Sequence, residues 1–116
     1  MSESFAERLR HLFDTVHPKG RGPYSQAEVV EAIRAAGGNM TPGYMSQLLS
    51  GKRSSPSWTT LRDICRVFAV PMDYFNDDEV YEEIKGYIAY IQELRDAENQ
   101  NIAARTYFPF RRPEKN

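Results

Sequence analysis

The sequence is poor in the residues that build covalent cross-links and metal sites. It has one cysteine, Cys65, and two histidines, His11 and His17. One cysteine cannot form a disulfide within the chain, and these three residues cannot supply a zinc site of cysteines and histidines. We therefore expect no disulfide scaffold, no bound metal and no other cofactor.

Long hydrophobic runs are also missing. No apolar stretch approaches the roughly 18–20 residues that a membrane-spanning helix needs. The first residues, MSESFAERLRHL, lack the apolar core of a signal peptide. We therefore expect a cytoplasmic protein that makes no contact with a membrane.

Patterns that would indicate catalysis are absent from the sequence as well. No motif places a histidine beside a serine, and no glycine-rich phosphate loop follows a strand. The sequence therefore predicts that the protein is not an enzyme.

The charged residues are distributed unevenly along the chain of 116 residues, whose net charge is −1. Residues 1–76 hold nine Lys or Arg against seven Asp or Glu, residues 77–105 hold three against eight, and residues 106–116 hold three against one. A chain of this length makes one domain with an appendage. We predict a mildly basic functional domain over 1–76, an acidic helical element over 77–105 and a basic tail over 106–116.

Periodic apolar residues predict four short helices within residues 1–76, with a further helical turn over 72–75. The first helix is expected at about 4–16 and the third at about 42–50. Each helix is preceded by a residue that commonly caps a helix N-terminus, namely Ser4, Ser25, Thr41 and Ser57. The inward face of the fourth helix is expected to carry Trp58, Leu61, Ile64, Cys65 and Phe68.

A longer helix is predicted from Asp78, because acidic residues favour the positive N-terminal end of a helix. Its apolar residues follow the heptad interval for about two repeats. They are Val80, Tyr81, Ile84, Tyr87, Ile88, Ile91 and Leu94. Such a stripe must pack either on the N-terminal domain or on a second copy of itself. We favour the second copy, which predicts a homodimer through the C-terminal helix, and we expect the tail over 106–116 to be loose.

The short helices, joined by the turn Gly37-Gly38-Asn39-Met40, indicate an all-α helix-turn-helix bundle. Residues 46–56 read SQLLSGKRSSP, and periodic aliphatic residues follow at Leu61 and Ile64. In this spacing of serine, aliphatic residue, glycine, lysine, arginine and proline, the chain resembles the XRE family of DNA-binding domains, the phage repressor and Cro type. The resemblance implies a five-helix, lambda-repressor-like bundle, here followed by the C-terminal dimerisation helix.

The XRE resemblance implies a role for each matching position. The helix at 42–50 would lie in the major groove of double-stranded DNA and read base edges with Thr41, Gly43, Tyr44 and Gln47. Gln47 can bond bidentately to adenine, and Tyr44 can pack on a thymine methyl or bond a phosphate. Phosphate contacts are implied for Gln26, Ser50, Lys52 and Arg53. Lys19 and Arg21, in the loop before the second helix, are further candidates for contacts with the DNA backbone or a minor groove.

A longer similarity, through about residue 95, is to the mycobacterial EspR-type regulators. It is carried by segments such as Gly20-Arg-Gly-Pro23, Ser46-Gln-Leu48 and Asp77-Asp78-Glu79. This resemblance implies a dimeric, nucleoid-associated transcription regulator of actinobacteria whose C-terminal helices form the dimer. We therefore predict a sequence-preferring DNA-binding regulator located in the nucleoid.

Plainer interpretations remain open for the same residues. Lys52 and Arg53 could be a solvated turn, and Gln47 could be an ordinary surface residue. Tyr44 could instead pack into the core. For the whole protein, the alternative is an interaction module that keeps the bundle but binds a partner protein, through the helix at 42–50 or through Tyr107-Phe108-Pro109-Phe110.

Overall fold

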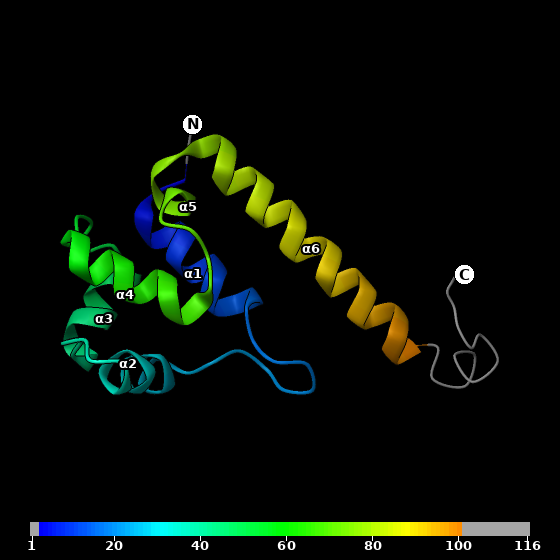
Figure 1. The fold of residues 1–116 in the computed structure, drawn as a ribbon, viewed down its shortest axis with the longest axis horizontal. Coiled ribbons are helices and arrows are strands. Elements are labelled where there is room, and N and C mark those ends of the chain that lie inside the picture. Colours follow the sequence, from blue (N-terminus) through cyan, green and yellow to red (C-terminus); the bar gives the residue numbers. More distant parts are fainter. Residues whose placement is uncertain (1–2, 101–116) are drawn as a thin grey trace. The chain divides into compact units, whose positions relative to one another are not determined.

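The computed structural model describes residues 3–100, and over these residues it contains helices and no strand. The helices are α1 (Phe5–Thr15), α2 (Gln26–Ala35), α3 (Pro42–Ser50), α4 (Trp58–Phe68), α5 (Asp73–Asn76) and α6 (Asp78–Gln100) (Figure 1). The predicted all-α fold class, a helix-turn-helix bundle with a C-terminal helix, is confirmed. The chain divides between Ile84 and Lys85 into two compact units. We call residues 3–84 the head unit and residues 85–100 the C-terminal unit.

The helices of the head unit begin where their capping residues predict. Each cap accepts a hydrogen bond from the backbone N–H three residues later, at 3.1–3.2 Å, and the caps are Ser4, Ser25, Thr41 and Ser57. The backbone N–H groups of Ser4 and Ser25 in turn donate to side-chain oxygens of Glu7 and Glu28, each at 2.8 Å. These bonds complete two capping boxes. Each such cap contributes about 1 kcal/mol to stability.

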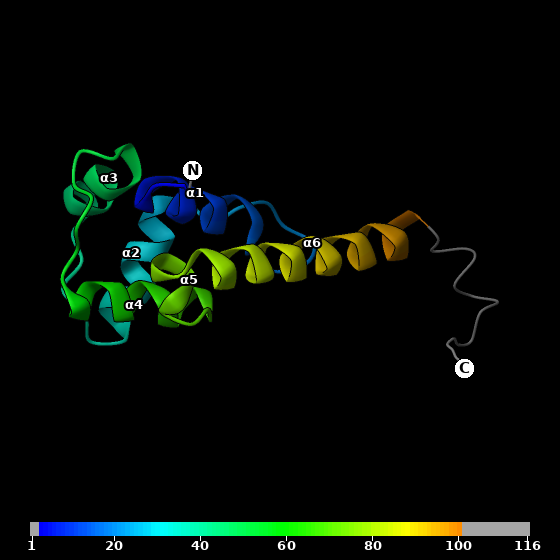
Figure 2. The ribbon, with the colours of Figure 1, turned by 90° about the horizontal axis from the view of Figure 1, so that it is seen from above.

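The core of the head unit is formed mainly by apolar residues from α1 to α5. Leu9, Met45, Leu48 and Ile64 are fully buried. Helix α1 packs on α3, and α2 packs on both α3 and α4; Figure 2 shows α3 and α4 on opposite sides of α2. Cys65 belongs to this core, where burial raises the pKa of its thiol to about 11. The core therefore fixes the position of α3 from two sides.

The prediction that Trp58 points inward is wrong, because 69% of the residue is exposed. The other predicted inward residues of α4, Leu61, Ile64, Cys65 and Phe68, are all buried. Trp58 is the first residue of the helix. Side chains on a helix lean toward its N-terminus, so a residue at the first position projects beyond the end of the packed face.

The start of α6 is joined to α1 through the buried side chain of Arg8, which is 3% exposed. Its Nη1 donates to the carbonyl of Tyr74 at 3.1 Å, and it forms an ion pair with Asp78. Its Cζ lies 4.3 Å from the centre of the Tyr81 ring. Tyr81 itself is 3% exposed and packs on Tyr74 with ring centres 5.1 Å apart. The placement of Tyr81 in the predicted dimer stripe is therefore corrected, because its side chain fills the core of its own head unit.

Beyond Ile84 the largest apolar side chains of α6 are exposed. The exposed fractions are 64% for Tyr87, 56% for Tyr90 and 54% for Leu94. Ile88 and Ile91 are half-buried. Among the described helices none is both long enough and apolar enough to cross a membrane. The predicted tail over 106–116 lies outside the described residues.

Candidate nucleic-acid interface

The turn between α2 and α3 depends on two glycines. Gly37 has a φ of +99°, a left-handed conformation that side chains disfavour. A Cβ atom on Gly38 would lie 2.6 Å from the Cγ2 of Ile33 and 2.7 Å from the Oδ2 of Asp63. The close approach of α2 and α4 at this point therefore requires glycine, and it sets where Thr41 and Pro42 begin α3.

Helix α3 has one buried face and one accessible face. Met45 and Leu48 point into the core and are fully buried. On the other face Thr41, Gly43 and Ser50 are exposed, and Tyr44 and Gln47 are half-buried. The predicted base-contacting residues are thus all at least partly accessible. Tyr44 is only half-buried, so it is available at that surface as well as in contact with the bundle.

A basic turn follows α3 and folds back over its last residues. Gly51 makes this reversal with a φ of +87°. The backbone N–H of Arg53 then donates to the carbonyl of Gln47 at 3.1 Å, and the hydroxyl of Ser50 donates to the same carbonyl at 3.1 Å. The turn is therefore anchored to the helix that it follows.

The side chain of Arg53 contacts two of the predicted base-contacting residues. Its Nε donates to the Oε1 of Gln47 at 2.9 Å. Its Cζ lies 5.9 Å from the centre of the Tyr44 ring, which is within cation–π range. Arg53, Gln47 and Tyr44 therefore form one cluster, which we call the α3 cluster.

A shallow hollow of about 440 Å³ lies beside the α3 cluster. It is lined by Gln47, Lys52, Arg53, Ser54 and Ser55. Two cations and two hydroxyl groups are suitable partners for a phosphate oxygen. Ser54 and Ser55 were not among the predicted phosphate contacts, although their place between Arg53 and Pro56 in the basic turn was a usable signal.

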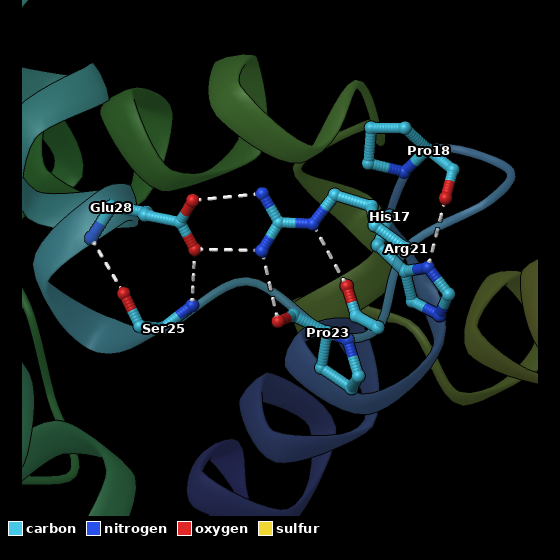
Figure 3. Close-up of polar contacts among 7 residues, drawn as sticks. His17, Pro18, Arg21, Pro23, Ser25 and Glu28 are labelled. Atoms are coloured by element: carbon cyan, nitrogen blue, oxygen red, sulfur yellow. Dashed lines mark hydrogen bonds and ion pairs between the residues drawn. The ribbon is translucent and has the colours of Figure 1, made fainter.

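Arg21 lies in the loop before α2 and is held by a carboxylate of its own head unit (Figure 3). Its Nη1 and Nη2 each donate to a carboxylate oxygen of Glu28 at 2.8 Å. Its Nε donates to the Gly22 carbonyl at 3.0 Å, and its Nη2 also donates to the Pro23 carbonyl at 3.2 Å. The Arg21 guanidinium, together with the Ser25 N–H, lowers the pKa of Glu28 to about 2. Arg21 therefore connects the loop to the N-terminus of α2.

The remaining predicted phosphate contacts lie on other elements of the head unit. Gln26 is the first residue of α2 and is exposed, and Lys19 is exposed in the loop that precedes Arg21. The structure thus brings Tyr44, Gln47 and Arg53 together with Lys52 at one surface. Arg21 is instead paired with Glu28, which its sequence position did not indicate.

The chain is similar to two proteins that carry the same name, nucleoid-associated protein EspR, from the CDC 1551 and H37Rv strains of Mycobacterium tuberculosis. Each is 43% identical to this chain over 107 residues, which cover 92% of this chain and 81% of the relative. No family model matches the chain. Both relatives, as their name states, are associated with the nucleoid.

Proposed function

Because this chain belongs to the EspR family of nucleoid-associated proteins, we propose that it is a DNA-binding transcriptional regulator of the bacterial nucleoid. It binds double-stranded DNA with a preference for particular base sequences, and it is not an enzyme. The α3 cluster is the observation that carries this proposal. A glutamine and a tyrosine on the accessible face of a short helix, beside a cationic turn, supply both base-reading and phosphate-binding groups.

Helix α3 has dimensions that suit the major groove. An α-helix with its side chains is about 10–12 Å across, which matches the major groove of B-DNA at about 12 Å wide, and the nine residues of α3 run for about 14 Å. In this groove we assign base contacts to the accessible residues Thr41, Gly43, Tyr44 and Gln47. Gln47 is the group best suited to a specific base edge, because an amide offers both a donor and an acceptor.

Phosphate contacts are assigned to residues at the end of α3 and in the turn after it, and to residues at or before the start of α2. They are Lys19, Gln26, Ser50, Lys52 and Arg53. The hollow beside Lys52 and Arg53 accommodates a phosphate between two cations. Arg21 contributes less than the sequence alone suggests, because it would first have to leave the carboxylate of Glu28.

We propose that the regulator acts as a homodimer through α6. The exposed Tyr87, Tyr90 and Leu94 recur at spacings of three and four residues and so lie along one helix face. An exposed apolar face of this kind is typical of an association surface. The half-buried Val80, Ile84, Ile88 and Ile91 are assigned to the rim of the same face. Two heads related by a two-fold axis would contact half-sites one or more helical turns apart.

Dimerisation has a measurable consequence for DNA binding. With Lys19, Lys52 and Arg53 as cationic contacts, one head should lose affinity with a log–log salt slope of about −3. Two heads acting together should give a slope of about −5. A weak head therefore becomes a useful binder when it is paired with a second one.

The test is fluorescence anisotropy with duplexes selected from a randomised pool and with unselected duplexes, at two salt concentrations, with the mass measured by light scattering on the same sample. We expect saturable binding with a slope near −5 from a particle of twice the chain mass. Gln47→Ala should reduce the preference for selected duplexes. Absence of binding would contradict the proposal and favour the protein-interaction module, whose apolar contacts depend little on salt.

A further inference from the structure

We propose that Arg53 is a specificity-determining residue, because it fixes the orientation of the Gln47 amide that faces the DNA. This inference rests on the proposed function, in which Gln47 reads a base. It adds a role for Arg53 beyond the phosphate contact that its charge and its place in the basic turn suggest.

The backbone of the turn holds Arg53 close to Gln47. Two hydrogen bonds, from the Arg53 N–H and from the Ser50 hydroxyl, converge on the Gln47 carbonyl. The reversal at Gly51 makes the bond from the Arg53 N–H possible, while the Ser50 bond lies within α3. The Arg53 side chain therefore starts from a position that is already tied to the residue it contacts.

The contact between the two side chains selects one orientation of the amide. A guanidinium carries only donors, so the atom of Gln47 that faces Nε at 2.9 Å is the oxygen. The rotated amide would place its NH₂ group against the Arg53 donor, with no hydrogen bond between them. The Gln47 nitrogen, with two donors, is therefore left for another acceptor, and the oxygen keeps one lone pair.

A fixed amide discriminates between bases better than a mobile one. A rotating amide can exchange its donor and its acceptor and so adapt to either pattern on a base edge. Ordering the side chain before DNA binds also removes an entropic cost of about 0.5–1.5 kcal/mol for an immobilised side chain. The ring of Tyr44, 5.9 Å from the guanidinium, further restricts where Arg53 can lie.

The neighbouring residue provides a matched control. Lys52 lies in the same turn, is exposed and lines the same hollow. Within the described part of the chain, no hydrogen bond joins its side chain to Gln47. Arg53→Met and Lys52→Met therefore each remove one cation from the same place, and only the first removes the contact with the amide.

The experiment measures binding to a selected duplex and to duplexes in which each base pair is changed in turn. The proteins compared are the unaltered chain, Gln47→Ala, Arg53→Met, Lys52→Met and the double variant Gln47→Ala with Arg53→Met. Gln47→Ala identifies the base pair that Gln47 reads. We expect Arg53→Met to reduce discrimination at that same base pair by about tenfold, and the double variant to lose no more than Gln47→Ala alone. Lys52→Met should keep the discrimination, while both methionine variants, which remove one cation from each of the two heads, lower the salt slope by about 2.

The outcomes separate this inference from the proposed function. If the unaltered chain binds no DNA, both fail. If it binds with a preference that Arg53→Met and Lys52→Met alter equally, or if the losses from Gln47→Ala and Arg53→Met simply add, DNA binding stands and the positioning role is overturned. The side-chain amide resonances of Gln47, recorded without DNA, give an independent readout. They should report an ordered amide in the unaltered chain and in Lys52→Met, and a mobile one in Arg53→Met.

Discussion

The head unit buries the apolar residues that define its helices, whereas the C-terminal unit exposes its largest ones. Leu9, Leu48 and Ile64 are fully buried in the head. Tyr87 and Leu94 in the C-terminal unit are more than half exposed. Several short helices can surround a common core, but one helix cannot enclose its own apolar face. The head unit therefore covers its own apolar residues, while α6 beyond Ile84 leaves its largest ones exposed, as the proposed dimer requires.

Two tyrosines on α6 make this comparison sharpest, because they are identical in chemistry and six residues apart. Tyr81→Ala should lower the free energy of unfolding by about 3–5 kcal/mol, because it empties a buried site against Arg8 and Tyr74. Tyr87→Ala, at a residue 64% exposed, should change the unfolding of the dilute chain by less than about 0.5 kcal/mol. Urea denaturation at low protein concentration measures both. Equal effects would contradict the division into a closed head and an exposed C-terminal face.

The exposed apolar face of α6 can be made charged by substitutions outside the head unit. Tyr87→Glu combined with Leu94→Glu should halve the mass in solution, because like charges would oppose each other across the proposed dimer seam. DNA affinity at fixed salt should fall by at least about tenfold, which is about 1.4 kcal/mol, and the salt slope should approach that of one head. Light scattering and anisotropy check the two effects. Glu82→Gln with Glu93→Gln, at exposed acidic positions of the same helix, is the matched control and should remain dimeric.

The C-caps of α4 and α3 offer a test with a smaller expected change in the free energy of unfolding. Ala69 ends α4 in a left-handed conformation with a φ of +58°, which favours glycine. Ala69→Gly should therefore stabilise the head by about 0.5–1 kcal/mol. Gly51→Ala should destabilise it by about 1 kcal/mol; its Cβ would meet only the Cβ of Ala6, at 3.7 Å. Thermal and urea unfolding should show opposite signs for the two variants, and shifts in the same direction would refute the explanation from backbone conformation.

The smallest expected effect is a pH dependence that belongs to the head. Its cause is the pKa of Glu28, lowered to about 2 by Arg21 and the Ser25 N–H. A lowered pKa in the folded state means that the contribution to stability is complete above the unfolded pKa of about 4.3 and is lost as the pH falls toward about 2. Unfolding at about pH 6 and about pH 3 should therefore show a loss of stability in the unaltered chain that is smaller in Glu28→Gln. An identical loss in both would show that other carboxylates dominate.

Much of the fold follows from local signals that can be read along the chain. The four capped starts at Ser4, Ser25, Thr41 and Ser57 were predicted correctly. An N-cap involves residues only three positions apart, so it needs no distant partner. The inward residues of α4 also followed from periodicity, except Trp58, where the periodic face extends beyond the bundle. Tyr90, which is 56% exposed, was not part of the predicted stripe, because it is out of register with the steps from Val80 to Leu94.

The candidate site was predictable in its parts and not in its connections. The spacing around Gln47, Lys52 and Arg53 indicated a DNA-binding helix and a basic turn. The hydrogen bond from Arg53 to Gln47 depends on a chain reversal at Gly51, and the pairing of Arg21 with Glu28 depends on the path of a loop. Sequence spacing alone does not decide which of several possible partners a long charged side chain reaches.

The sequence by itself determined where the four short helices begin, which faces are apolar and where the basic turn lies, because these depend on neighbours within one or two helical turns. Only the tertiary structure decided that Tyr81 belongs to the head, that Arg21 is held by a carboxylate and that Arg53 contacts the amide of Gln47. Those outcomes depend on the packing of α1, α2 and α3 and on the paths of the loops. Together these decide which side chains come within a few ångströms of each other. Burial and partner choice are set by that packing, since periodicity specifies a face of a helix and not what covers it.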